Sequence, residues 1–110
     1  KNMKQTEFLE KHIFNDLKNL NDGFDDETIH YFSESDFETV LERVAYFGIG
    51  LYSITPRLEG EPFEVATHND FKKKATDARW YNKCFSDFKK RQSGLSYAAT
   101  YKVSSKLLAR

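Results

Sequence analysis

The sequence of 110 residues predicts one α+β domain, a ferredoxin-like βαββαβ sandwich preceded by an amphipathic helix. Two observations support this fold class. After the N-terminal helix, the hydrophobic segments follow the order strand, helix, strand, strand, helix, strand. Helix caps, prolines and glycines lie at the boundaries that this order requires. In such a sandwich both helices cover one face of an antiparallel sheet, so the other face is open to a ligand or a partner.

The N-terminal segment over residues 3–20 is predicted to form the amphipathic helix. Its apolar residues recur at helical spacing: Leu9, Ile13, Leu17 and Leu20. An isolated helix of this length is marginal in water, so its apolar face must be covered. The helix packs either on the domain's own sheet or across a dimer. Because small domains commonly bury apolar faces by two-fold pairing, we expect a dimer interface through Leu9, Ile13 and Leu17.

The core elements follow within residues 28–103, and residues 104–110 form a tail. In chain order they are predicted as strand 28–32, helix 33–47, strand 49–55, strand 63–68, helix 76–92 and strand 95–103. Ser35 and Glu38 have the spacing of a capping box at the start of the first core helix, and Gly48 is its expected stop. Pro56 is expected to end the second strand, and a turn over residues 58–62 makes a hairpin.

Strict alternation assigns each strand residue to a face of the sheet. The face toward the helices is predicted to hold Ile29, Tyr31, Leu51, Phe63, Val65, Tyr97 and Tyr101. The open face is predicted to hold His30, Phe32, Tyr52, Ile54, Glu64, Ala66, His68, Ala98, Thr100 and Lys102. This open face mixes polar and apolar side chains, which is typical of a surface covered by a helix, a second subunit or a ligand.

The formal net charge is zero, which argues against a dedicated nucleic-acid binder or a protein of anionic membranes. The charge is nevertheless polarised along the chain. Residues 22–42 contain eight acids and no Lys or Arg, whereas residues 72–91 contain eight bases and two acids. We expect solvated faces from these runs; the alternative is a self-complementary surface that pairs head to tail.

One cysteine, Cys84, excludes an internal disulfide, and its aromatic surroundings predict a buried thiol. There is no secretory signal and no apolar stretch of membrane-spanning length, so we expect a cytoplasmic protein with no membrane contact. No motif of a catalytic site, a metal site or an organic cofactor is present. The protein is therefore expected to carry no cofactor and is interpreted as a binding protein rather than an enzyme.

The candidate ligand-binding residues are His30, Tyr52 and His68 on the open sheet face. His68 and Asp70 have a spacing that two metal ligands can adopt, but without a third ligand nearby we expect ordinary surface groups. The carboxylates at Glu59, Glu61 and Glu64 bracket an exposed turn, where they are expected to act as solubilising charges.

Trp80 and Tyr81, beside the basic run Lys72–Lys74, have the composition of a platform for single-stranded nucleic acid. The aromatic residues of such platforms lie on central strands, and these two residues lie on a helix. We therefore expect no specific nucleic-acid binding, and we expect Trp80 to be half-buried at the edge between helix and sheet.

Four sequence runs carry a resemblance to a known family. They are Ile29-His30-Tyr31-Phe32-Ser33, Gly48-Ile49-Gly50-Leu51-Tyr52, Arg79-Trp80-Tyr81 and Tyr97-Ala98-Ala99-Thr100-Tyr101. In this order they resemble a family of small uncharacterised bacterial accessory proteins of the integron gene-cassette type. The family pattern has Trp and Pro at two positions where this chain has Arg57 and Ser104. The resemblance covers residues 29–108 and implies a compact bacterial protein; it transfers no activity and no site residue.

Two classes of function remain open. The leading hypothesis is a non-catalytic interaction or binding module that self-associates. The alternative is a small-molecule-binding protein, or a minor enzyme, with a pocket between the open sheet face and the N-terminal helix. Stabilisation by a saturating ligand distinguishes the second class, and a solution mass that depends on protein concentration distinguishes the first.

Overall fold

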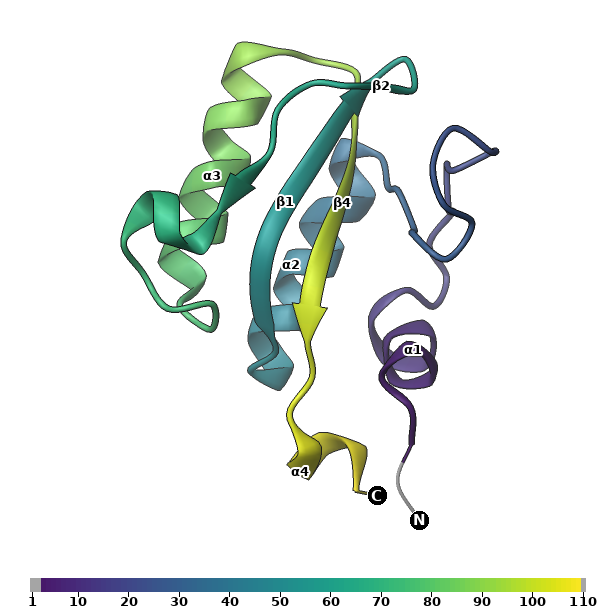
Figure 1. Ribbon diagram of the computed structural model, residues 1–110, viewed down its shortest axis with the longest axis vertical. Coiled ribbons are helices and arrows are strands. Elements are labelled where there is room, and N and C mark those ends of the chain that lie inside the picture. The colour runs from purple at the N-terminus through teal and green to yellow at the C-terminus, as the bar shows by residue number, and fades with distance from the viewer. Residues whose placement is uncertain (1–2, 110) are drawn as a thin grey trace.

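The computed structural model describes residues 3–109, in which helices pack on one face of an antiparallel sheet (Figure 1). The elements in chain order are α1 (Gln5–Phe8), the π-helical turn η1 (Leu9–Ile13), α2 (Glu34–Phe47), β1 (Gly50–Leu58), β2 (Glu61–Pro62), β3 (Ala66–Thr67), the 3₁₀ turn η2 (His68–Phe71), α3 (Ala78–Arg91), β4 (Leu95–Lys102) and α4 (Ser105–Leu108). Helix α2 contacts β4, α3 contacts β1, and the two helices contact each other. The predicted α+β class is confirmed. Among the described residues, no helix combines the length and apolar composition needed to cross a lipid bilayer.

Strand β1 occupies the centre of the sheet. Along one side it pairs with β4, from Gly50 opposite Lys102 to Leu58 opposite Leu95. Along the other side it pairs with β2 and β3, two pieces of one interrupted strand. The turn between β1 and β2 consists of Glu59 and Gly60, both with positive φ, as a tight two-residue hairpin requires. Beyond β4, Phe32 is the only residue within 3–109 that pairs with it, in an isolated bridge with Tyr97.

The ferredoxin-like strand order is not confirmed. That order would place strand 28–32 in the interior of the sheet. The observed order runs from β2 and β3 through β1 and β4 to Phe32 at the edge. Residues 28–31 do not continue the pairing with β4. On the edge that points away from β4, side chains of the preceding loop bind their backbone. Asn21 Nδ2 donates to the Ile29 carbonyl at 2.9 Å, and the Tyr31 N–H donates to Asn19 Oδ1 at 3.0 Å.

Several assignments of side chains to sheet faces were wrong. Ala66, predicted on the open face, lies opposite Ile54 and is buried, whereas Val65, predicted to face the helices, is 57% exposed. The register of β1 shifts between Leu51 and Ser53, so Ile54 turns toward the helices and is fully buried instead of lying on the open face. Phe32 lies opposite Tyr97, and partners in an antiparallel pair share a face, so Phe32 also faces the helices. Tyr31 consequently lies on the other side. There its hydroxyl contacts Arg57 instead of the helix layer.

Two predicted element boundaries also change. Strand β1 continues through Pro56 and does not end there. The neighbouring strand is interrupted opposite Pro56, so no N–H is needed from the proline. Its carbonyl accepts the Phe63 N–H. Helix α2 is capped by Ser33, whose Oγ accepts the Asp36 N–H, and Ser35 is not the cap. Its end at Gly48, with φ of +70°, is as predicted.

The core is built mainly from aromatic rings between the sheet and the helices. Phe37 of α2 stacks on Tyr97 of β4 at 5.2 Å between ring centroids, and Phe85 of α3 meets the same tyrosine edge-on at 5.0 Å. Trp80 is buried, with 1% of its surface exposed, and not half-buried as predicted. These contacts hold both helices against β1 and β4 and leave the outer edge of β4 to the N-terminal segment.

Candidate ligand-binding site at the edge of strand β4

The three residues predicted to bind a ligand do not form one site. Tyr52 and His68 lie near each other, with ring centroids 6.1 Å apart, and the His68 Nδ1 is 2.7 Å from the Lys73 carbonyl oxygen. His30 lies past the opposite edge of the sheet, where its ring stacks on Phe14 at 4.7 Å. Because Phe32 faces the helices, His30 also turns to that side and leaves the open face.

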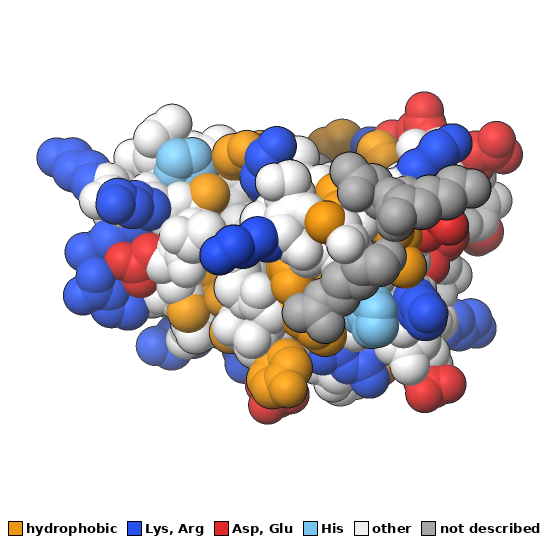
Figure 2. All heavy atoms as spheres, turned by 90° about the horizontal axis from the view of Figure 1, so that it is seen from below, with side chains coloured by type: hydrophobic (Ala, Val, Ile, Leu, Met, Phe, Trp, Pro, Cys, Tyr) orange, Lys and Arg blue, Asp and Glu red, His pale blue; other side chains and the backbone are white. Residues whose placement is uncertain are grey.

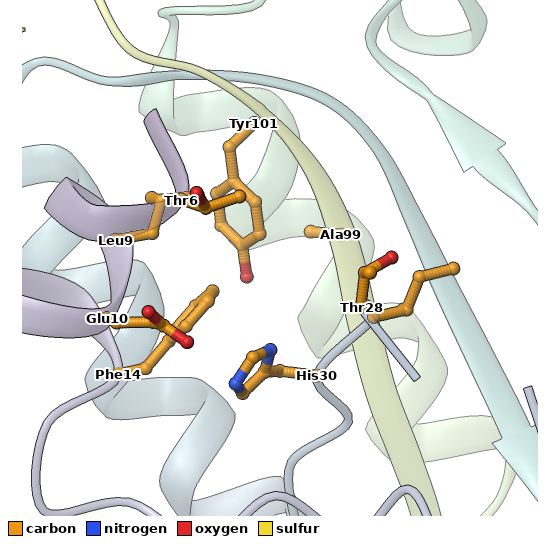
Figure 3. Close-up of a pocket in the computed structure, with 9 residues that line it drawn as sticks. Thr6, Leu9, Glu10, Phe14, Thr28, His30, Ala99 and Tyr101 are labelled. Carbon is orange, nitrogen blue, oxygen red and sulfur yellow. The ribbon is translucent and has the colours of Figure 1, made fainter. Parts of the chain in front are cut away.

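His30 instead lines a pocket of about 340 Å³ at the outer edge of β4, which we call the edge pocket (Figure 3). Its walls come from the N-terminal helical segment, residues 28–30 and β4. The apolar lining residues are Leu9, Phe14, Ile29 and Ala99. The polar groups that bound it include the Glu10 carboxylate, the His30 imidazole and the Tyr101 hydroxyl, which Figure 3 shows turned toward the same space.

The N-terminal wall is a helical segment much shorter than predicted. The prediction of one helix over residues 3–20 was wrong. Helix α1 and the turn η1 together end at Ile13, and Asp16 has a φ of +67°, which no α-helix contains. Arg43 of α2 accounts for this end, because its guanidinium donates to the carbonyls of Ile13 and Asn15, each at 2.9 Å. The turn that follows places Phe14 against the edge of the sheet.

The apolar side chains of this segment are buried within the single chain. Ile13 has no exposed surface and Leu9 is 5% exposed, and Phe8 packs edge-on against Phe47 of α2 at 5.4 Å. Leu17 is partly buried against the same core. The chain itself thus covers this face, which is the intramolecular alternative. A dimer interface through Leu9, Ile13 and Leu17 is not needed to cover it, and a dimer stays a prediction.

The second wall, residues 28–30, is held by a polar network on its far side. The Tyr31 hydroxyl donates to Asp25 Oδ2 at 2.5 Å, and Arg57 Nε donates to the same hydroxyl at 3.0 Å. Arg57 also donates to the Gly60 carbonyl at 2.6 Å, so it joins the acidic loop to the hairpin. The hydrogen bond from Tyr31 is the largest cause that lowers the pKa of Asp25.

The Tyr101 hydroxyl is the most unusual group in the edge pocket. It is buried and has no hydrogen-bond partner among the described residues. Burial raises the pKa of Tyr101, so the hydroxyl stays protonated and is available as a donor. Most buried polar groups in proteins are hydrogen-bonded, and an exception requires an explanation. Alternation along β4 correctly placed Tyr101 toward the helices, but no sequence signal could show that its hydroxyl lacks a partner.

The backbone edge of β4 beside the pocket is also incompletely paired. Phe32 and Tyr97 exchange two hydrogen bonds of 2.8 Å. Further along the strand, the Gln5 side chain donates to the Tyr101 carbonyl at 3.1 Å and accepts from the Val103 N–H at 3.0 Å. Between these contacts, the outward N–H and C=O of Ala99 and the N–H of Tyr101 have no partner within residues 3–109.

Other chemically reactive groups lie apart from this edge. Cys84 is buried, and burial raises its pKa to about 12, which keeps the thiol protonated and unreactive. Glu64 forms an ion pair with Arg91 at 2.8 Å on the surface of the domain. Within the described part of the chain, no three His, Cys, Asp or Glu side chains are grouped so that they could hold a metal ion.

No family model matches the chain, and no curated protein or solved structure matches it. The resemblance to bacterial accessory proteins of the gene-cassette type therefore stays a prediction, and the function has to be argued from the geometry of the edge pocket.

Proposed function

We propose that this protein binds a small, mostly apolar ligand in the edge pocket and performs no chemistry on it. The observation that carries the proposal is the buried hydroxyl of Tyr101, which has no hydrogen-bond partner within residues 3–109 and lies at an apolar pocket of about 340 Å³. The pocket lies within the size range of about 300–1,000 Å³ that is typical of small-molecule sites. A ligand that offers an acceptor to this hydroxyl would remove the cost of the missing hydrogen bond.

The lining residues define the chemistry of such a ligand. Leu9, Phe14 and Ile29 favour an aliphatic or aromatic group. The Tyr101 hydroxyl favours a ligand that carries a hydrogen-bond acceptor. The Glu10 carboxylate at the pocket disfavours an anionic ligand and favours a neutral or cationic one.

A fragment screen tests the proposal. Small apolar compounds that carry one carbonyl or ether acceptor are expected to raise the melting temperature of the wild-type protein at saturation. Tyr101→Phe removes only the hydroxyl and is expected to weaken the best fragment about threefold to tenfold, the value of one hydrogen bond. Tyr97→Phe is the matched control. The Tyr97 hydroxyl is also buried without a partner in the described part of the chain, but Tyr97 does not line the edge pocket.

Two outcomes contradict the proposal. One is a screen in which no compound of this class shifts the melting temperature. The other is a fragment whose affinity falls equally in Tyr101→Phe and Tyr97→Phe, because a uniform loss would report a general change in the core and not a contact in the pocket.

Self-association is the second candidate function, and a separation of charge favours it. In Figure 2, Lys and Arg side chains predominate at one end of the view, and most of the visible acidic side chains lie at the other. Lys72, Lys73 and Lys74 form no ion pair with another described residue, and neither do Asp22 and Glu27. Ends of opposite charge would attract each other in a head-to-tail association of two copies.

A further inference from the structure

The ladder between residues 28–32 and β4 opens after a single pair. Phe32 pairs with Tyr97, and continuation in the same register would place His30 opposite Ala99 and Thr28 opposite Tyr101. Neither pair forms among the described residues. The unpaired edge of β4 therefore offers a donor and an acceptor on Ala99 and a donor on Tyr101, which is the set of groups that an extended peptide backbone complements.

A pocket lies on each face of this open ladder. The edge pocket is on the helix side. A second pocket of about 440 Å³, which we call the far-face pocket, shares Thr28, Ile29, Ala99 and Tyr101 with it. The far-face pocket also reaches Asp25 and Thr100. Successive side chains of an extended peptide point to opposite faces, so a peptide on this edge would direct neighbouring side chains into different pockets.

The charge around the two pockets restricts the peptide further. Glu10 lines the edge pocket, and neither lining includes a Lys or an Arg. Asp25 lines the far-face pocket, where its charge is partly offset by Arg57 at 3.5 Å. The acidic residues Asp22, Asp26 and Glu27 lie in the same loop as Asp25. A peptide with basic residues is therefore favoured over an acidic one.

We propose that the ligand of this site is an extended peptide segment of about three residues that adds to the edge of β4. Its central residue pairs with the backbone of Ala99 and places an apolar side chain in the edge pocket. The flanking residues are basic and point toward the far-face pocket. This inference rests on the proposed function, because it names the ligand class of the same pocket.

The probe is N-acetyl-Lys-Met-Lys-amide, since methionine fits irregular apolar pockets and its sulfur can accept a weak hydrogen bond from the Tyr101 hydroxyl. Titration into the ¹⁵N-labelled full chain is expected to give saturable shifts of the Ala99 and Tyr101 amides. Methylation of the Met amide nitrogen, which faces β4 in the pairing, is expected to weaken binding about tenfold. Methylation of the third residue's amide, which points away from β4, is the matched control and is expected to change affinity less than twofold. The Glu-Met-Glu version is expected to bind more weakly at low salt.

Equal affinities of the two N-methylated peptides, or no binding of any of them, would overturn the peptide inference. The proposed function is judged separately by the fragments. If fragments bind in a Tyr101-dependent way and the peptides do not, the pocket is a small-molecule site and only the peptide inference fails. If neither class binds, both proposals fail.

Discussion

A single guanidinium connects the acidic loop to the sheet. Arg57 contacts the Tyr31 hydroxyl, the Gly60 carbonyl and, at 3.5 Å, the Asp25 carboxylate. It also lies over the Phe24 ring at 5.5 Å. The function of this side chain could not be predicted, because its partners come from a loop about thirty residues earlier in the chain.

The Asp25 carboxylate makes stability depend on acid pH. The folded protein lowers the pKa of Asp25 below 3.8, so its stabilising contribution is present above that pH and is lost as the pH falls through the folded value. Asp25→Asn is therefore expected to lower the melting temperature at pH 6, and the difference from wild type is expected to shrink between pH 4 and pH 2.5. Asp22→Asn is the control, because Asp22 forms no ion pair with another described residue. A difference that stays constant with pH would contradict this account.

The two long helices were predicted well, and the sheet was not. Helix α2 spans Glu34–Phe47 and α3 spans Ala78–Arg91, close to the predicted 33–47 and 76–92. Their boundaries were predictable because the caps are local in sequence: Asp77 accepts the Arg79 N–H, and Gly48 takes a left-handed conformation. The strand order depends on which backbone groups pair across segments that are distant in sequence. Residues 28–31 do not continue the pairing of Phe32 with β4, and their outward groups bind Asn19 and Asn21; no periodicity reveals such contacts.

The N-terminal helical segment stops at Ile13 because Arg43 of α2 binds the carbonyls of Ile13 and Asn15. Arg43→Met keeps much of the aliphatic stem and removes the two charged hydrogen bonds to Ile13 and Asn15. We expect the free energy of unfolding to fall by about 1–3 kcal/mol. This is the combined contribution expected of two hydrogen bonds from a charged group that is partly exposed to solvent. Urea denaturation measures the loss, and hydrogen exchange is expected to become faster in residues 5–14.

Lys90→Met is the control for this change, since Lys90 forms no ion pair with another described residue and is expected to alter stability by less than about 0.5 kcal/mol. Equal losses in the two variants would show that Arg43 does not hold the segment.

At the scale of the whole molecule, the acidic and basic segments meet at one point and otherwise lie apart. Lys89 of α3 pairs with Glu38 of α2 at 3.7 Å. In Figure 2, one end of the view is mainly basic, whereas the other carries most of the visible acids together with several Lys and Arg side chains. The mainly basic end is the basis of the self-association candidate. The sequence predicted the polarised charge correctly. The prediction of solvated charged faces agrees with the single ion pair that joins the two segments among the described residues.

Head-to-tail association through these ends is expected to depend on salt. At millimolar protein concentration, sedimentation velocity is expected to show a weight-average mass above that of the monomer at 20 mM salt and the monomer mass at 500 mM salt, because the shorter Debye length screens exposed charges. Replacing Lys72, Lys73 and Lys74 together with Gln is expected to give the monomer mass at both salt concentrations. A mass that is unchanged by salt and by these substitutions would exclude association through charge.

The central claim is that ligand recognition occurs at the edge of β4 and not at Tyr52 and His68, where the sequence placed two of its three candidates. The most direct measurement is the change in the backbone amide spectrum of the full chain when the best apolar fragment is added. We predict that the perturbed amides lie in residues 28–30 and 99–101, the residues around the unpaired Tyr101 hydroxyl. Perturbations centred on Tyr52 and His68, or spread evenly over the sheet, would contradict the account.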